Sequence, residues 1–226
     1  MHDGLQGAYI APPAGGKPDC LVVLCHGLHA DGSQLSQLAE VWRDTLPKAG
    51  FAFPNAPWQR RRHWLWPFLP KRREWFGVQD NRPAAYDAGV RAAGALLDRF
   101  IDAELARLAL APDAYVLAGY SQGAMVVLFA GLRRAVAPRA IVGIAGSLIA
   151  PETLPNEIRN RAPVMLLHGA DDPIVPASSS RLAADSLVDI GVPVKTMYQS
   201  GLNHEIGDIE IKESALFLKS ILRGDD

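Results

Sequence analysis

The sequence has few cysteines, no long apolar run and no excess of charge of one sign. Its two cysteines, Cys20 and Cys25, are five positions apart on one expected strand, so their side chains point to opposite faces and cannot easily bridge. We therefore expect no disulfide framework, and we expect a reducing, cytoplasmic compartment. No apolar run approaches the ~20 residues of a membrane span, and the first residues lack the pattern of a signal peptide. We therefore expect no stable insertion into a membrane.

Positive and negative side chains nearly balance, with 23 Lys and Arg against 24 Asp and Glu. This balance argues against a nucleic-acid partner and against an acidic tail. With 226 residues, 49% of them hydrophobic, the chain can bury one sizeable core. No internal repeat or flexible linker divides it, so we expect a single domain over residues 1–226.

Short apolar runs closed by glycine, proline or a polar turn alternate with segments of helical periodicity. Runs that are apolar on both faces are typical of strands buried in a mostly parallel sheet. The expected strands cover residues 21–25, 51–53, 115–118, 140–145, 164–167 and 194–198. The expected helices cover residues 90–108, after Pro83 in a first turn, and residues 122–134, 178–189 and 205–222. The alternation predicts an α/β fold with a doubly wound, mostly parallel sheet, whose chemistry gathers at the carboxyl ends of the strands.

The segment Gly119-Tyr120-Ser121-Gln122-Gly123 matches the pattern G-x-S-x-G. It follows an expected strand and opens an expected helix, which is the context in which this pattern presents a nucleophilic serine. At so sharp a turn the serine takes strained backbone angles, and side chains two positions to either side would clash. The simpler interpretation is a glycine-flanked serine in an ordinary turn, but the surrounding strand and helix favour Ser121 as a nucleophile.

A serine nucleophile needs a histidine base that a carboxylate orients. With this pattern the chain order is Ser, then Asp or Glu, then His. Asp171 and Asp172 both follow the strand expected over residues 164–167. We favour Asp172 as the acid because Pro173 biases it to extended geometry, while Asp171 is the alternative and could bind a loop amide. Only one histidine, His204, comes after the acid in a loop before the last helix, so it is the predicted base.

The turn after the strand over residues 21–25 predicts an oxyanion hole. A glycine-containing turn here can aim a backbone N–H at a developing oxyanion, together with the N–H of the residue after the nucleophile. The predicted donors are Leu28 and Gln122, and a plain strand-to-helix turn is the alternative. His26 and His168 each end a strand before a glycine, and we interpret both as structural.

These residues together resemble the phospholipase/carboxylesterase family, which includes acyl-protein thioesterases and small bacterial carboxylesterases, over nearly the whole chain. The matching stretches are His26–Gly32, Pro54–Pro57, Trp75–Phe76, Gly119–Ala124, His168–Pro176 and His204–Ile206. In that family the aspartate of the acid loop precedes a proline, which corresponds to Asp172. The resemblance implies the α/β-hydrolase fold and a hydrolase of carboxylic esters or thioesters that uses no cofactor or metal and is often a homodimer.

The sequence departs from that family at three places. His29 stands where the family usually has glycine, and Gly77 stands where it has aspartate. The third departure is an insertion at residues 58–74, in which three tryptophans and a phenylalanine are framed by Arg60–Arg62 and Lys71–Arg73. We interpret it as a flap over an acyl pocket or a patch for anionic substrates, with a solvated loop as the alternative.

The predicted function is a serine hydrolase that cleaves small-molecule esters or thioesters of short to medium acyl chains through Ser121, Asp172 and His204. The predicted substrate contacts are His29, Trp66 and Trp75. Lysophospholipase and acyl-CoA or acyl-protein thioesterase activities are alternatives, and so is a non-catalytic binding module on the same fold. A cysteine hydrolase using Cys25 would lack the required turn, and we interpret Cys25 as a small buried hydrophobe.

Overall fold

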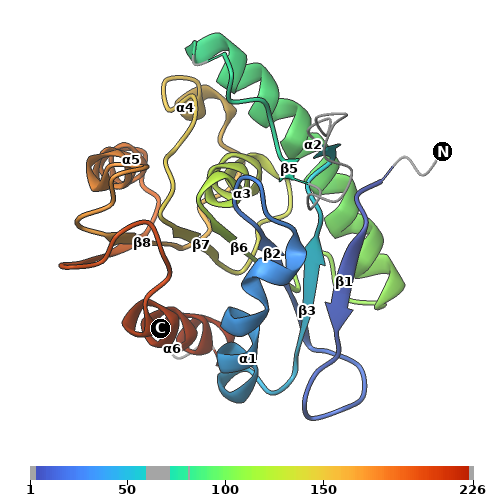
Figure 1. Ribbon diagram of the computed structural model, residues 1–226. Helices are drawn as coiled ribbons and strands as arrows, with labels where there is room; N and C mark the ends of the chain where they lie inside the picture. The colour runs from blue at the N-terminus through green and yellow to red at the C-terminus, as the bar shows by residue number, and fades with distance from the viewer. Residues whose placement is uncertain (1–3, 60–71, 81, 224–226) are drawn as a thin grey trace, which may run out of the picture.

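The computed structural model describes residues 4–59, 72–80 and 82–223, which form one main sheet covered by helices on both faces (Figure 1). The strands of the main sheet are β1 (Gly7–Ile10), β2 (Cys20–Cys25), β3 (Ala49–Pro54), β6 (Tyr115–Tyr120), β7 (Ile141–Ile144), β8 (Val164–Gly169) and β9 (Val194–Gln199). The helices are η1 (Gly32–Leu35), α1 (Ser36–Thr45), α2 (Pro83–Arg107), α3 (Gln122–Arg133), α4 (Leu154–Glu157), α5 (Ala177–Asp189) and α6 (Asp208–Arg223).

The main sheet has the strand order β1-β3-β2-β6-β7-β8-β9. β1 runs antiparallel to β3, whereas the other neighbours in this order are parallel. From β2 the chain continues to β3 on one side and later enters β6 on the other, so the strand order reverses between β2 and β6. Ligands of open α/β sheets bind at such a reversal. The predicted doubly wound, mostly parallel sheet is confirmed.

Two apolar layers flank the sheet. Helices α2, α3 and α5 cover one face, and α1 and α6 cover the other (Figure 1). Trp42 of α1 is fully buried in the second layer, and its indole N–H donates to the Ile211 carbonyl of α6 at 3.1 Å. Cys25 belongs to the first layer and Cys20 to the second, and both are free thiols. The prediction that they point to opposite faces is therefore confirmed.

Several features differ from the expectations drawn from the sequence. β1, which was not expected, is an edge strand of four residues. A strand this short gives no clear alternation of apolar and polar residues. α1 was not expected, although the Asp31 carboxylate accepts the Ser33 N–H at 2.9 Å before it, and its buried face is limited to Leu38, Ala39 and Trp42. β9 is only half-buried because it forms an edge of the sheet. Edge elements bury fewer side chains, so their sequence patterns are weaker.

Strand register brings the predicted site together at the carboxyl edge of the sheet. Cys25 at the end of β2 pairs with Gly119 of β6, so the turns that follow these two strands lie side by side. Gly169 at the end of β8 pairs with Gln199 at the end of β9, so the loops after these strands are neighbours as well. The predicted nucleophile, oxyanion donors, acid and base all belong to these four connections.

Candidate active site

The turn between β6 and α3 holds Ser121 in a backbone conformation that most residues avoid, with φ 54° and ψ -118°. A side chain at Gly119 would overlap the backbone of Gly123, and one at Gly123 would overlap the carbonyl of Cys25. The Ser121 N–H donates to the Ile144 carbonyl at 2.8 Å. Glycine at both flanking positions therefore lets α3 begin directly against β2, and the packing holds the strained serine in place.

Side chains from the loops after β6, β8 and β9 form one hydrogen-bonded line. Ser121 Oγ lies 3.0 Å from His204 Nε2, and His204 Nδ1 lies 2.6 Å from Asp172 Oδ2. A carboxylate only accepts, so Nδ1 carries the proton of that bond, and Nε2 of the neutral ring can accept the Ser121 hydroxyl. The Asp172 side chain is fully buried, whereas the His204 side chain keeps 17% exposure. The structure thus brings together the residues predicted as nucleophile, acid and base.

The backbone at His204 is held by the residue before the nucleophile. The Tyr120 hydroxyl donates to the His204 carbonyl at 2.7 Å, and the two ring centroids lie 5.2 Å apart. Burial, together with the nearby Asp172 charge, raises the pKa of Tyr120 to about 12. The phenol therefore keeps its proton at neutral pH and remains a donor to the loop that carries the imidazole.

The surroundings of Asp172 favour its charged form. Its Oδ1 accepts the N–H groups of Ile174 at 2.8 Å and of Val175 at 2.9 Å. Burial by itself raises the pKa of Asp172, but the hydrogen bonds from His204 and from these N–H groups outweigh it and lower the pKa below its usual value. A buried anion held in this way can orient the His204 ring and stabilise its protonated form.

Two neighbours of Asp172 have supporting contacts. Asp171 accepts the Gly201 N–H at 2.7 Å, the loop amide that its alternative interpretation required. His168 is buried, with Nε2 2.8 Å from the Val175 carbonyl and 3.2 Å from Asp172 Oδ2. Since a carbonyl only accepts, this Nε2 carries a proton that also faces the carboxylate. The structural interpretation of His168 missed this contact with Asp172, which its place four residues earlier could have suggested.

The turn after β2 carries the first predicted oxyanion donor. Ala30 N–H donates to the Gly27 carbonyl at 3.4 Å, so Leu28 and His29 are the central residues of a turn. His29 has φ 66°, and a positive φ at this place in a turn favours glycine. Among the described residues, no group accepts a hydrogen bond from the backbone N–H of Leu28 or of Gln122. Both predicted donors are therefore available to a ligand.

Residues 73–76, at the end of the insertion and directly after it, support the turn after β2. The Trp75 indole N–H donates to the His26 carbonyl at 2.8 Å, and the two rings lie 5.5 Å apart between centroids. The His29 N–H donates to the Arg73 carbonyl at 2.7 Å. The end of the insertion is thus bonded to both sides of the predicted oxyanion donor of this turn.

The same segment also holds the second predicted donor residue. The Gln122 side chain accepts the Trp75 N–H and donates to the Phe76 carbonyl, each at 2.8 Å. Gln122 is 3% exposed, so its amide serves this internal contact while its backbone N–H opens the helix. The sequence pointed to the backbone of Gln122 and left the role of its side chain unassigned.

The structure places Trp75, one of the predicted substrate contacts, in the core. Its side chain is 0% exposed, and its only polar group is bonded to the His26 carbonyl. In this position the ring supports the turn after β2. His29 is half-buried, which leaves part of its ring for contact with a substrate. The third predicted contact, Trp66, lies outside the described residues.

The ends of the insertion form a small hairpin. β4 (Trp58–Gln59) pairs antiparallel with β5 (Arg73–Glu74), and the Arg73 guanidinium donates to the Ala56 carbonyl at 3.0 Å. The Trp58 side chain on this hairpin is 53% exposed. Residues 60–71 lie outside the described part of the chain, so the flap interpretation stays a prediction.

Cys25 and His26, at the end of β2, match the roles expected from the sequence. Cys25 is 0% exposed, and burial raises the pKa of its thiol far above the usual value, which leaves no thiolate to act as a nucleophile. His26 Nε2 accepts the Ala56 N–H at 3.0 Å, so its Nδ1 carries the proton and donates to the Gly27 carbonyl at 2.7 Å. Burial lowers the pKa of His26, in agreement with a neutral structural ring.

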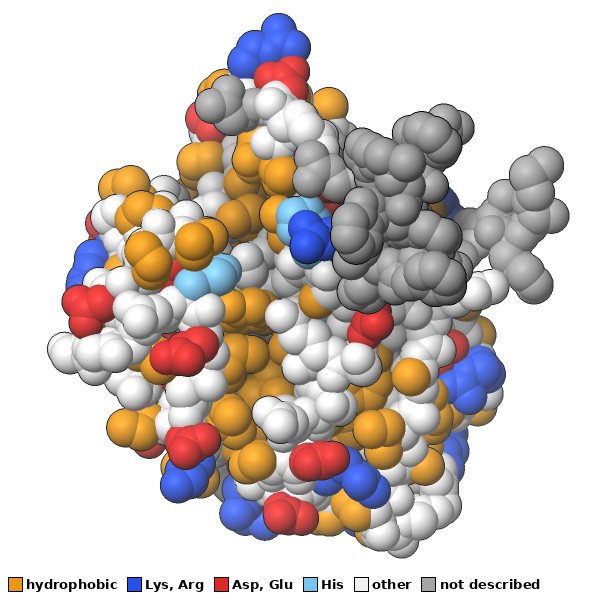
Figure 2. Space-filling view, viewed as in Figure 1, with side chains coloured by type: hydrophobic (Ala, Val, Ile, Leu, Met, Phe, Trp, Pro, Cys, Tyr) orange, Lys and Arg blue, Asp and Glu red, His pale blue; other side chains and the backbone are white. Residues whose placement is uncertain are grey.

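A cavity of ≈ 260 Å³ opens beside His204, between α1 and the loop before α6. Its lining residues besides His204 are Gln34, Gln37, Leu38, Tyr120, Glu205, Ile206 and Ile211. Figure 2 shows hydrophobic side chains gathered in a hollow on this face, with polar groups along its border. The space next to the imidazole is therefore suited to an organic group of mixed polarity.

Within residues 4–59, 72–80 and 82–223, no cluster of three or more His, Cys, Asp or Glu side chains could hold a metal ion. None of the helices in this part of the chain combines the length and apolar character that crossing a membrane requires.

Known proteins are similar to this chain over most of its length. A family model described as Phospholipase/Carboxylesterase matches residues 7–222. The chain is 27% identical to an acyl-protein thioesterase 1 of Gibberella zeae, over 94% of this chain and 96% of that protein. Its fold resembles the crystal structure of esterase PE8, with TM-score 0.86 and 35% identity over 96% and 99% of the two chains. It also resembles Zea mays acyl-protein thioesterase 2, with TM-score 0.75 and 25% identity over 96% and 99%.

Proposed function

The chain belongs to the phospholipase/carboxylesterase family and is a hydrolase, and we propose that it cleaves small-molecule esters or thioesters of short to medium acyl chains with Ser121 as its nucleophile. Asp172 and His204 complete the machinery, and the N–H groups of Leu28 and Gln122 form the oxyanion hole. The single observation that carries this proposal is the continuous line from Ser121 Oγ through His204 to Asp172, with separations of 3.0 and 2.6 Å.

The reaction proceeds in two acyl transfers. His204 Nε2 takes the hydroxyl proton as Ser121 Oγ attacks the carbonyl carbon, and the carbonyl oxygen becomes an oxyanion that the two backbone N–H groups bind. Asp172 stabilises the imidazolium and keeps its ring oriented. His204 then gives its proton to the departing alcohol or thiol, which leaves Ser121 acylated. Water, deprotonated by the same imidazole, attacks the acyl-enzyme and releases the carboxylic acid.

The substrate class draws support from the relatives, which are named esterases and acyl-protein thioesterases. The amphipathic cavity beside His204 gives an organic leaving group a place near the proton donor. If the insertion at residues 58–74 is a flap over the acyl pocket, it is our candidate for the segment that sets acyl length, and a solvated loop is the alternative. A lysophospholipid and an acyl-CoA or acyl-protein thioester are the alternative substrates within the same chemistry.

We also propose that the chain works as one domain in the cytoplasm, and that it pairs as a homodimer, as the family resemblance implies. The family match over residues 7–222 supports the single domain. Sedimentation of the purified chain tests the homodimer, since a monomer at all accessible concentrations would contradict it.

The decisive experiment compares the wild type with Ser121→Ala. We expect a fluorophosphonate probe to label only the wild type, and hydrolysis of p-nitrophenyl esters to fall roughly 10⁴-fold or more in the variant. A matched series of acyl-CoA thioesters separates ester from thioester preference. If Ser121→Ala keeps the wild-type turnover, Ser121 is not the nucleophile. A wild type that neither reacts with the probe nor hydrolyses any of these substrates would instead indicate a non-catalytic binding module.

A further inference from the structure

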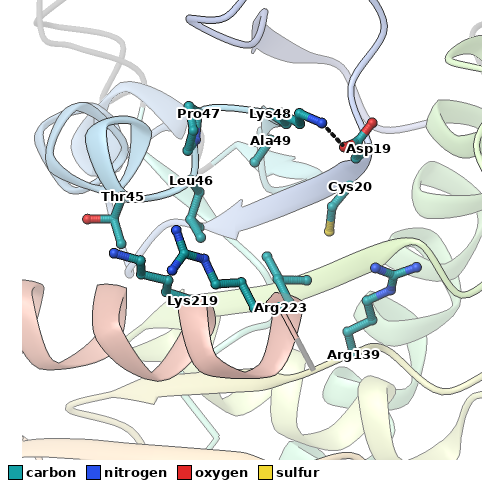
Figure 3. Close-up of a pocket in the computed structure, with 11 residues that line it drawn as sticks. Asp19, Cys20, Thr45, Leu46, Pro47, Lys48, Ala49, Arg139, Lys219 and Arg223 are labelled. Atoms are coloured by element: carbon teal, nitrogen blue, oxygen red, sulfur yellow. Dashed lines mark ion pairs between the residues drawn. The ribbon is translucent and has the colours of Figure 1, made fainter. Parts of the chain in front are cut away.

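A second cavity, of ≈ 350 Å³, is lined by residues other than those of the proposed active site (Figure 3). Cys20 and Ala49, the first residues of β2 and β3, are part of its wall. Ser121 follows the last residue of β6, which runs parallel to β2. The cavity is therefore separated from the proposed active site by the length of the strands, and nothing in the hydrolytic machinery uses it.

Positive charge dominates the polar groups around this cavity. Lys48, Arg139, Lys219 and Arg223 line it from three parts of the chain, namely the loop before β3, the segment before β7 and the last turns of α6 (Figure 3). The only carboxylate among its lining residues is Asp19. Lys219 and Arg223 lie on the same side of the cavity, whereas Arg139 lies on the other side (Figure 3). Because like charges repel, an anion between Lys219 and Arg223 would stabilise both.

Within residues 4–59, 72–80 and 82–223, the ion pairs in this region leave part of that charge unneutralised. Lys48 Nζ lies 3.4 Å from Asp19, but both side chains are largely exposed, so water weakens the pair (Figure 3). Arg139 lies 3.9 Å from Asp113, at the limit of ion pairing. Among the residues that the structure describes, no carboxylate pairs with Lys219 or Arg223.

The remaining wall is apolar and adds no negative charge. Leu46, Ala49 and Leu222 contribute hydrocarbon surface, and Cys20 belongs to the same lining. Burial raises the pKa of Cys20 to about 12, so its sulfur is a neutral thiol at physiological pH. The volume falls within the ~300–1,000 Å³ of small-molecule sites. There is thus room for an organic group beside an anionic one.

We propose that this cavity binds a small organic phosphate, with its phosphate held by Lys219 and Arg223 and its organic part on the apolar wall. A phosphate monoester carries nearly two negative charges at neutral pH. This matches two cations, Lys219 and Arg223, that have no carboxylate partner among the described residues better than a single carboxylate does. Guanidinium groups bind phosphate oxygens in pairs, and a lysine adds a point charge. The inference does not depend on the assignment of the triad.

The test uses phenyl phosphate and inorganic phosphate as probes, with potassium chloride keeping the ionic strength constant. We expect saturable binding by calorimetry and a rise in Tm, with phenyl phosphate tighter than inorganic phosphate because of the apolar wall. The variant Lys219→Gln/Arg223→Gln should weaken binding about tenfold or more. Its matched control, Lys195→Gln/Lys212→Gln, removes the same charge outside the cavity and should bind like the wild type. Both variants should keep the wild-type rate of ester hydrolysis.

Several outcomes would overturn the proposal. Absence of saturable binding would mean that the cations serve only the helix ends and the solvent, and equal weakening in both double variants would indicate a general charge effect. Vesicles of phosphatidylcholine, with and without phosphatidic acid, separate a free phosphate from a lipid headgroup. If the protein sediments with the phosphatidic acid vesicles but does not bind phenyl phosphate, the ligand of this cavity is a lipid headgroup in a membrane and not a small molecule.

Discussion

At the scale of single residues, the two adjacent aspartates show how differently neighbours can be used. Asp172 is buried, accepts two backbone N–H groups and faces His204 at 2.6 Å. Asp171 is exposed and bonds the Gly201 N–H of the adjoining loop. Each carboxylate therefore stabilises the loop in its own way, but only one of them can orient the imidazole.

Replacing each aspartate by asparagine separates these roles. Asp172→Asn should lower kcat roughly 10³- to 10⁴-fold, because an amide no longer selects the tautomer whose Nε2 accepts the Ser121 proton. Asp171→Asn keeps an oxygen that can accept from Gly201, so its kcat should stay within about twofold of the wild type. Steady-state kinetics with a p-nitrophenyl ester measures both. The reverse order of effects would move the acid to Asp171.

At the scale of elements, residues 73–76 connect the insertion with the oxyanion loop and with α3. Trp75 contributes its backbone N–H to Gln122 and its indole N–H to the His26 carbonyl. Because transition-state stabilisation depends on small displacements of the donors, a change in this segment should act on turnover more than on binding.

The variant Trp75→Phe removes the indole N–H and leaves an aromatic ring in the core. We expect the unfolding free energy to fall by about 1–3 kcal/mol, since the buried His26 carbonyl loses its donor. We also expect kcat to fall roughly tenfold with KM nearly unchanged. Trp58→Phe, at an exposed position of the same hairpin, is the matched control and should match the wild type in both respects. A raised KM at unchanged kcat in Trp75→Phe would place the indole in substrate binding after all.

Helix α6, which follows the His204 loop, begins with a buried carboxyl. Glu210 is 0% exposed, and one of its oxygens accepts the Gly207 N–H at 3.1 Å. Burial raises the pKa of Glu210 to about 7, with a further contribution from the charge of Glu205. The folded chain therefore holds a proton on this carboxyl between about pH 4.5 and pH 7, where the unfolded chain has released it.

This difference predicts the direction of a pH effect on stability. The contribution of Glu210 to the free energy of unfolding is fully present below the pKa of this group in the unfolded chain. It is lost as the pH rises through about 7, because the buried carboxyl must then ionise or the chain must unfold. Between pH 5 and pH 8 the free energy of unfolding of the wild type should fall by about 1–3 kcal/mol because of Glu210. Urea unfolding of Glu210→Gln should lack that loss, whereas Glu213→Gln on the same helix should retain it. An identical pH dependence in all three proteins would show that Glu210 does not titrate in this range.

At the scale of the whole molecule, the sheet separates two ends with different chemistry. The carboxyl edge collects Ser121, Asp172 and His204 from connections that are far apart in sequence, because neighbouring parallel strands end together. The amino ends of β2 and β3 adjoin the cationic cavity. A ligand bound there could alter the stability of the fold without contact with the reacting groups.

The insertion offers a test at this scale, because β4 and β5 pair and can be closed by a short turn. Replacing residues 60–71 by a Gly-Ser turn should shift the acyl-chain preference measured with p-nitrophenyl esters, if the insertion is a flap over the acyl pocket. The hairpin ends and the bonds of Trp75 remain in this variant, which keeps the oxyanion loop supported. An unchanged chain-length profile would favour the solvated loop.

Much of the fold and the site could be predicted from the sequence, because the signals are local. A buried strand, a sharp turn and a helix are encoded within a few residues of Ser121, and the chain order of the acid and base follows from where the strands end. Weakly patterned edges such as β1 escaped prediction because they bury few side chains.

Contacts between distant segments were decided only by the tertiary structure. The sequence next to Trp75 does not show whether its ring faces a ligand or the core. The packing of α3 and β2 decides this, because it places the ring against His26. The same holds for His168 beside Asp172, and for the cations that Lys48, Arg139 and α6 bring to one cavity. Periodicity and motif spacing determine which elements form and which chemistry is present, but burial and proximity depend on how those elements pack.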